Sequence, residues 1–294
     1  MATAAEPGAG SRALAVDAAN RALGAAGRVA DEVEILVNAG VYRDENIVEP
    51  AMGPFIQRGI GANSTFPPLN GTRTFSFDLA NGAGGPLTAI RVIDGFMRSG
   101  AVRSGLVVAS DADPDPSRSE NYPFAATGGA ILLRATANGE GFAWFGARTW
   151  SEHFSLYEAR LCGTGGLEPA SEEWSARSQR LRFVQREDFA LRAADCVGRT
   201  VEEATREGRL DPAEVELVIA APGGVAFREA LAERLRRAGV TAAVPAAVGS
   251  GAHTASTAFA LAVARGDGSW ERSRRILFVA AGAGITVSLA LYER

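Results

Sequence analysis

The sequence predicts an α/β fold built from two halves that share one plan. Helical segments alternate with nearly continuous apolar segments of strand length, as in mostly parallel sheets that are covered by helices on both faces. The same order of elements occurs twice along the chain. A length of 294 residues, of which 47% are hydrophobic, is sufficient for two such cores.

An alanine-rich helix followed by a strand begins each half. In the first half, residues 11–40 contain the helix, a turn and the apolar strand 33–37. In the second half, a helix over about 188–207 leads to the apolar strand 215–219. Both strands lack regular polar alternation, so we expect each to be buried on both faces.

A central helix and two further strands complete each half. Ala83 begins a helical segment that leads to the strand 106–109, and His253 begins the helix 254–265, which leads to the strand 276–279 at the same spacing. The glycine-led strands that close the halves are 128–133 and 284–289. This repetition predicts two similar units packed around shared central helices.

The predicted division places the N-terminal half at 11–145, a connecting region at 146–185 and the C-terminal half at 186–294. The stretch from Asp111 to Tyr122 is rich in Asp, Pro and Ser and is expected to be a loop. Residues 146–170 are expected to be irregular.

The candidate site is the segment 75–85, where an apolar strand ends in a glycine-rich turn and a helix begins. A side chain at such a corner points into a cleft near the positive end of the helix dipole, which lowers the pKa of a cysteine. Here the corner holds Ala83, which has no nucleophilic atom. The turn also lacks a following Lys-Ser/Thr pair and GxGxxG spacing, which disfavours nucleotide binding.

Bulk properties exclude several function classes. A net charge of −4 disfavours a nucleic-acid partner, and no apolar run reaches the roughly 18 residues of a membrane span. The N-terminus lacks the pattern of a signal peptide, so a cytoplasmic location is expected. The two cysteines and two histidines have neither disulfide-framework nor metal-ligand spacing, and no metal is expected.

The duplicated β-α-β-α-β-β plan resembles the thiolase fold, which implies a layered α-β-α-β-α structure. Specific segments are similar to β-ketoacyl-acyl-carrier-protein synthase III, from about Ser11 to Tyr292 and most weakly over 146–185. These segments are 41–50 (VYRDENIVEP), 55–57 (FIQ), 60–63 (IGAN), 77–79 (FDL) with the following turn, and 282–286 (GAGIT). The resemblance also implies that the family's first strand is missing here, together with part of the pantetheine tunnel mouth.

The resemblance implies a Cys-His-Asn catalytic set, and this chain differs at all three positions. The cysteine position is Ala83, the histidine position is Gly223 after Pro222, and the asparagine position is His253. In the family the cysteine takes an acyl group from a thioester, and the other two bind the second substrate's carbonyl oxygen. That mechanism is therefore not expected here. No cofactor is expected, and acyl-CoA or acyl-pantetheine is the possible ligand.

Each remaining candidate has a functional and a structural interpretation. In the functional interpretation, His253 hydrogen-bonds a carbonyl oxygen or acts as a base. In the structural interpretation, which the sequence favours, it is a helix-start histidine held by local backbone. Cys162 is expected to be an ordinary loop thiol. The alternative is that Cys162 and His153 form a catalytic Cys-His pair at a position other than the corner. Cys196 is expected to be a small buried hydrophobe in a helix.

Two arginine clusters are interpreted as solvated helix faces, or as a docking site for an acyl carrier protein or a pantetheine phosphate. The first cluster contains Arg177, Arg180, Arg182 and Arg186, and the second contains Arg228, Arg234, Arg236 and Arg237.

Three functions stay open. The favoured one is a non-catalytic subunit that pairs with an active synthase III-like homologue in fatty-acid or polyketide-type secondary metabolism. The others are a stand-alone acyltransferase that uses His253 without a covalent intermediate, and a homodimeric acyl-binding or scaffold protein.

Overall fold

A computed structural model describes residues 2–4, 9–65, 71, 73–117, 119–163, 179–222, 224–244 and 251–294. The first of two main sheets has the strand order β1-β5-β4-β2-β3, in which β2 runs parallel to β3 and β4, and β5 runs antiparallel to β4 and β1. Its strands are β1 (Ala2–Ala4), β2 (Ile35–Asn38), β3 (Phe75–Asp78), β4 (Ser104–Asp111) and β5 (Thr127–Arg134).

The second sheet repeats this topology with the order β6-β11-β10-β9. Strands β9 and β10 are parallel, and β11 is antiparallel to both β10 and β6. Its strands are β6 (Gly141–Thr149), β9 (Leu217–Ala221), β10 (Arg275–Gly282) and β11 (Thr286–Glu293). The equivalent order of strands confirms the duplicated plan predicted from the sequence.

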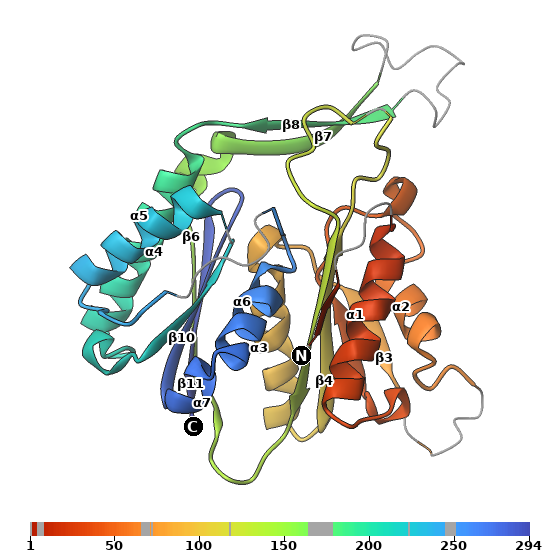
Figure 1. Cartoon of the computed structure of the whole chain (residues 1–294), viewed down its shortest axis with the longest axis horizontal. Coiled ribbons are helices and arrows are strands. Elements are labelled where there is room, and N and C mark those ends of the chain that lie inside the picture. Colours follow the sequence, from red (N-terminus) through yellow and green to blue (C-terminus); the bar gives the residue numbers. More distant parts are fainter. Residues whose placement is uncertain are drawn as a thin grey trace.

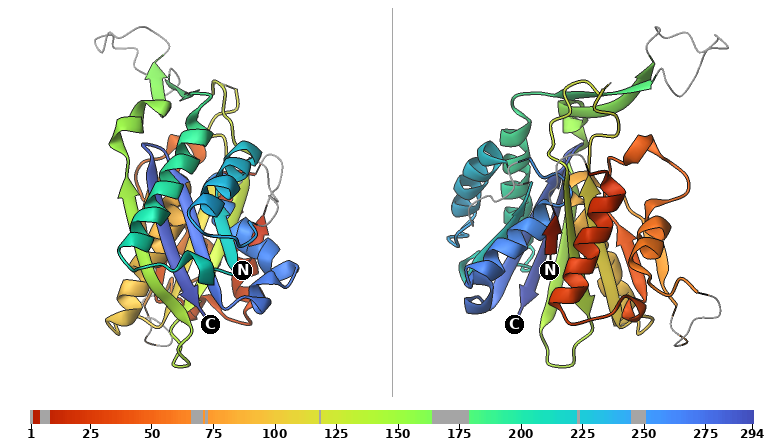
Figure 2. Two further views of the ribbon diagram at one scale, coloured as in Figure 1. Left: turned by 90° about the vertical axis from the view of Figure 1, so that its left-hand side faces the viewer. Right: turned by 45° about the vertical axis from the view of Figure 1, so that its right-hand side comes forward.

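Helices separate and cover the sheets, which gives the five-layered α-β-α-β-α arrangement (Figure 1). The outer helices are α1 (Ser11–Ala25) and α2 (Met52–Ile60) beside the first sheet, and α4 (Phe189–Arg206) and α5 (Val225–Arg237) beside the second. The central layer contains α3 (Gly85–Arg98) and α6 (Ser256–Gly266), which is followed by the short α7 (Ser269–Arg272). Figure 2 shows α4 and α5 in front of the second sheet. None of the helices in the described ranges is long and apolar enough to cross a membrane.

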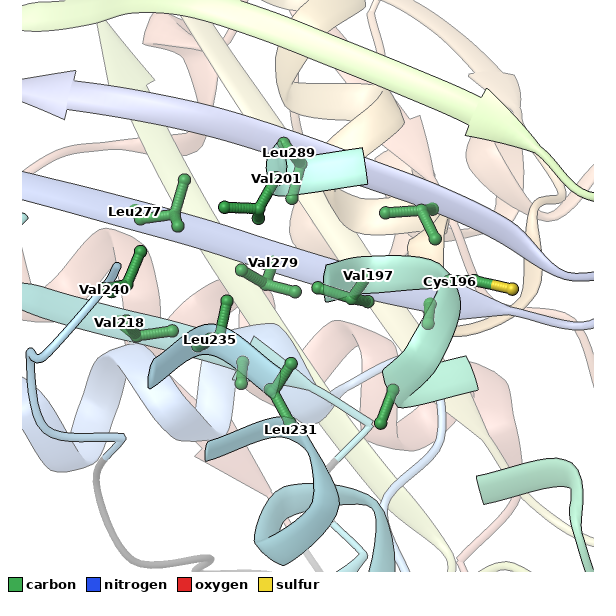
Figure 3. Close-up of a cluster of buried hydrophobic side chains, with 14 of the residues drawn as sticks. Cys196, Val197, Val201, Val218, Leu231, Leu235, Val240, Leu277, Val279 and Leu289 are labelled. Carbon is green, nitrogen blue, oxygen red and sulfur yellow. The ribbon is translucent and has the colours of Figure 1, made fainter. Parts of the chain in front are cut away.

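Burial on both faces explains the continuous apolar runs. In β2, Ile35 and Val37 face the central helices, whereas Leu36 faces α1 and α2, and all three are fully buried. The second sheet has an equivalent outer core, in which Val197 of α4 and Leu231 of α5 pack on its strands (Figure 3).

Two adjacent glycines let helices approach β5 from opposite faces. A Cβ atom on Gly128 would lie 2.5 Å from the Leu14 carbonyl oxygen of α1, and one on Gly129 would lie 2.6 Å from Cβ of Ala258 of α6. Contacts this short would force the helices away. The glycine-led start of this strand therefore sets the distance between the first sheet and the central layer.

Three local expectations need correction. Residues 146–170 are partly regular, because β6 extends to Thr149 and a 3-10 turn (Ser151–Leu156) leads into β7 (Tyr157–Gly163). Strand β7 pairs with β8 (Gln179–Gln185) in a hairpin that runs across the top of the view in Figure 1. Asp111 is the last residue of β4 and does not begin a loop. The short strand β1 pairs with β5 in the first sheet, just as β6 pairs with the equivalent strand β11 in the second sheet. The first strand of the fold is therefore present in this chain, contrary to the expectation.

Candidate functional site

The glycine-rich corner has the predicted strand-turn-helix structure. After β3, a 3-10 turn (Gly82–Gly84) leads directly into α3, and Pro86 lies in the first turn of that helix. Gly82 has a φ of +50°, which glycine adopts without strain. Ala83 is 3% exposed, so its methyl group forms part of a buried wall.

His253 lies just before α6 and is bound by a carboxylate from the other half. Its Nδ1 is 3.2 Å from Oδ2 of Asp111, the fully buried last residue of β4. The same Oδ2 accepts hydrogen bonds from the backbone N–H of Thr254 at 3.0 Å and from the Thr254 hydroxyl. His253 is therefore held by a residue distant in sequence, and not by local backbone as the sequence favoured.

The other oxygen of Asp111 is also fully engaged. Oδ1 accepts the backbone N–H groups of Val41 at 2.9 Å and Tyr42 at 2.8 Å. Burial raises the pKa of Asp111, but the electrostatic interaction with His253 and the hydrogen bonds from His253, Thr254 and Tyr42 outweigh it and lower the pKa to about 2. The carboxylate is consequently ionised at neutral pH.

Aromatic rings surround the imidazole. The Phe124 ring stacks on His253 with centroids 4.3 Å apart and an interplanar angle of 18°, and the Tyr42 ring centroid is 5.3 Å away. The Tyr42 hydroxyl hydrogen-bonds the Tyr157 hydroxyl of the β7–β8 hairpin at 2.8 Å. Phe183 of the same hairpin packs on Tyr42. The hairpin thus fixes the aromatic side of the site.

A cavity of about 360 Å³ brings the sequence-predicted positions together. Ala83 and His253 both line it, as do Pro222 and Gly224. Gly223 itself lies outside the described residues. The cavity is mainly apolar, and its other walls include the hairpin, the starts of α4 and α5, the glycine-rich end of β10 and the segments that precede β5 and α6.

The Nε2 atom of His253 faces the corner that holds Ala83. It lies 3.8 Å from the point that a Cβ atom on Gly82 would occupy. The imidazole therefore presents one nitrogen to Asp111 and the other to the position where the resemblance places a nucleophile. This arrangement can move a proton at Nε2, or hydrogen-bond a carbonyl oxygen there.

The structure does not bring the cysteines into this site. Cys162 lies on β7 and not in the predicted loop, and it does not line the cavity. Cys196 is buried in α4 as expected, and burial raises the pKa of its thiol to about 11. In the described part of the chain, no group of three His, Cys, Asp or Glu side chains could hold a metal ion.

The second arginine cluster lies on α5 and is partly neutralised. Arg234 pairs with Asp195 and Glu233, and Arg237 pairs with Glu233. Arg177 of the first cluster lies outside the described residues, and Arg182 pairs with Glu120 at 3.9 Å. Acidic partners therefore accompany members of both clusters, but Arg180 and Arg182 lie on strand β8 and not on the helix face that the sequence predicts. Carrier-protein docking stays a prediction.

Sequence reasoning missed Asp111 and the aromatic rings around His253. A polar residue that directly follows a predicted apolar strand could have drawn attention to Asp111, because such residues gather at one edge of a sheet. Its partner lies 142 residues away in the sequence, so no local motif links the two.

Comparisons with known proteins agree with this architecture. The family model of 3-oxoacyl-[acyl-carrier-protein] synthase III matches residues 77–151. The β-ketoacyl-[acyl-carrier-protein] synthases III of Acidiphilium cryptum and Rhodospirillum centenum are 28% and 27% identical to the chain, over 95% of it and 82% of each relative.

Solved structures share the fold at lower identity. A 3-oxoacyl-[acyl-carrier-protein] synthase III from Aquifex aeolicus superposes with a TM-score of 0.72 at 19% identity, covering 99% of this chain and 86% of that one. A variant of OleA from Xanthomonas campestris gives 0.75 at 15% identity, covering 98% and 84%. The tetronic acid condensing enzyme AbyA1 superposes with a TM-score of 0.69 at 20% identity, covering 96% of this chain and 86% of that one.

Proposed function

Because the chain is a synthase III-like protein with the thiolase fold, we propose that it binds acyl thioesters but acts as the non-catalytic partner of an active homologue. The reaction of the pair would be acyl condensation in fatty-acid or polyketide-type metabolism. The observation that carries this proposal is Ala83, which lines the cavity at the corner where the resemblance places a cysteine. No thiol is present among the described residues that line this cavity.

An exposed sheet edge supports pairing with another chain. Within the described residues, β3 is the outermost strand of the first sheet, and its Phe75 is 58% exposed. An uncovered edge strand presents free backbone donors and acceptors that a second strand can use. Since β3 leads into the corner at Gly82, a partner at this edge would lie close to the cavity.

Co-expression with an intact homologue tests the pairing. We expect the two chains to copurify as a heterodimer by native mass measurement, and the homologue to have altered acyl selectivity or activity in the complex. The proposal fails if the chains never associate and the homologue is fully active alone. A chain found only as a homodimer that binds acyl thioesters would favour the scaffold function.

A cysteine introduced at the corner tests whether the cavity admits acyl thioesters. In an Ala83→Cys variant the new thiol would lie near the start of α3, which favours the thiolate. Intact mass measurement after incubation with an acyl-CoA should show one acyl group on this variant and none on the unmodified protein, which retains Cys162 and Cys196. Gln185→Cys is the matched control, because it places a thiol on a cavity-lining strand away from the corner. Equal acylation of both variants would contradict a specific site.

A second function is favoured by Asp111. A histidine that is oriented by a buried carboxylate is suited to proton transfer, so the chain alone would be an acyltransferase that uses His253 without a covalent acyl-cysteine. Acyl transfer from a thioester to a small nucleophile, catalysed by the purified chain and absent from His253→Ala, would establish it. Failure to turn over any acyl thioester would exclude this function and leave the partner-subunit and scaffold functions.

A further inference from the structure

The imidazole of His253 is fixed in the orientation of a general base. Asp111 is an ionised acceptor, so the hydrogen-bonded Nδ1 of a neutral His253 carries the proton and Nε2 carries the lone pair. The stacked Phe124 ring limits rotation of the imidazole out of this plane. A buried base that is oriented by a carboxylate is the arrangement that activates a nucleophile in hydrolases.

Among the described residues that line the cavity, none supplies a nucleophile next to this base. Ala83 contributes only a methyl group, and the described lining residues include no Ser, Thr, Cys or Lys. The single hydroxyl in that lining belongs to Tyr157, and burial raises the pKa of this phenol to about 12. Its oxygen is also hydrogen-bonded to Tyr42. With no nucleophile among these described residues, water is the candidate that His253 could activate.

We propose that His253 and Asp111 activate water at the corner beside Ala83, and that the protein hydrolyses acyl thioesters. This inference rests on the second function proposed above and identifies water as the acyl acceptor. The apolar cavity walls formed by Phe189, Val225 and Phe227 suit an acyl chain.

The step balances without a further reactant. The water oxygen attacks the thioester carbonyl carbon while one of its protons moves to Nε2 of His253. The carbon–sulfur bond then breaks, and the proton on Nε2 passes to the departing sulfur. The products are a carboxylic acid and a free thiol, with no change of oxidation state. Asp111 stabilises the imidazolium that forms between the two proton transfers.

Thiol release from acyl-CoA, measured for the whole chain, tests the inference. We expect hydrolysis above the buffer rate, with one ¹⁸O atom incorporated into the acid when the reaction runs in H₂¹⁸O. His253→Ala should reduce kcat by a factor of about 10²–10⁴, the contribution of a general base. The matched control is His153→Ala, because His153 lies outside the cavity lining, in the turn before β7, and its loss should leave the rate unchanged.

Asp111 is a positioning residue, and its variant needs a separate measurement. Asp111→Asn should lower kcat more than about tenfold with KM nearly unchanged, and should alter the pH profile of kcat, because the orientation and basicity of His253 change. A merely structural role would lower the fraction of folded protein and would leave the pH profile of the folded fraction intact.

Binding of a non-hydrolysable thioether analogue of acyl-CoA separates this inference from the proposed functions. If the analogue binds the unmodified protein and His253→Ala equally, and only the unmodified protein releases thiol, the inference holds. If the analogue binds but no thiol is released above the buffer rate, hydrolysis is excluded and acyl binding stands. If the analogue does not bind and no thiol is released, the inference is overturned together with acyl-thioester binding at this site. Equal rates for His253→Ala and His153→Ala would also overturn it.

Discussion

The two halves place two structurally equivalent pairs of residues at the site, and one pair is ionisable whereas the other has no polar side chain. Asp111 ends β4 and pairs with Thr127, the first residue of β5, just as Gly282 ends β10 and pairs with Thr286, the first residue of β11. The residues that precede the two central helices are His253 and Ala83. One half-site is therefore the buried pair Asp111 and His253, and the other is the bare pair Gly282 and Ala83.

This difference separates what the fold dictates from what it leaves free. At the bare pair, a Cβ atom on Gly282 would lie 3.0 Å from the Asn81 carbonyl oxygen and 3.8 Å from the Ala83 nitrogen, so backbone fills the space that the Asp111 side chain fills in the other half. The duplicated backbone brings strand end and helix start together in both halves. Which side chains stand at the strand end and the helix start then determines, separately for each pair, whether a charged group lies there.

The largest expected effect on stability comes from removing the carboxylate of the polar pair. Asp111→Ala removes the acceptor of three backbone N–H groups, the Thr254 hydroxyl and His253 in a fully buried position. Because breaking a buried network leaves unpaired donors, we expect the free energy of unfolding to fall by about 3–5 kcal/mol in denaturant titrations. Gly282→Ala at the equivalent position should cost only about 1 kcal/mol, from the tight contact with Asn81. Equal losses would show that the two positions are energetically alike.

Acid should weaken the polar half-site next. The pKa of Asp111 is about 2 in the folded protein and near its ordinary value of 3.8 in the unfolded chain. Above about pH 5 both states are almost fully ionised and the stabilisation is complete; as pH falls from there toward 2 the unfolded chain binds the proton first, so stability decreases. The difference corresponds to about 2 kcal/mol. Other carboxylates titrate in the same range, so the test is the unfolding free energy of the unmodified protein minus that of Asp111→Asn between pH 2 and 5. A pH-independent difference would contradict the interpretation.

The fold was predictable because its strands are buried on both faces. Neighbouring residues such as Ile35 and Leu36 face different cores, which produces the apolar runs that define the repeat. The β7–β8 hairpin lacks this signal, because Leu181 and Phe183 are buried while Arg182 and Val184 between and after them are exposed. Alternation of this kind is typical of a strand with one face in solvent, and it has no counterpart in the apolar runs that define the repeat.

The candidate site was only half predictable from the sequence. The corner at Ala83 follows from a strand, a glycine-rich turn and a helix that are adjacent in the chain. The partner of His253 does not, because Asp111 reaches it only when the two halves pack together. A composition rich in Asp, Pro and Ser after Asp111 correctly signals irregular structure from residue 112 onward, but it hides the strand's last residue.

The smallest expected effect distinguishes how the two central helices begin. Three residues after Ala83, Pro86 restricts the start of α3 through its fixed φ, whereas three residues after His253 the Ser256 hydroxyl lies 2.7 Å from the carbonyl oxygens of Ala252 and His253 and donates to them. Ser256→Ala should lower the free energy of unfolding by about 1 kcal/mol, because buried carbonyl groups lose a donor. Pro86→Ala should also cost about 1 kcal/mol, since it increases the entropy of the unfolded chain and removes buried side-chain atoms. Hydrogen exchange sharpens the contrast: Ser256→Ala should speed exchange of the amides around His253 beyond the global loss, and Pro86→Ala should change exchange only through global stability. Faster local exchange at α3 in Pro86→Ala would show that both helix starts are held by native-state contacts.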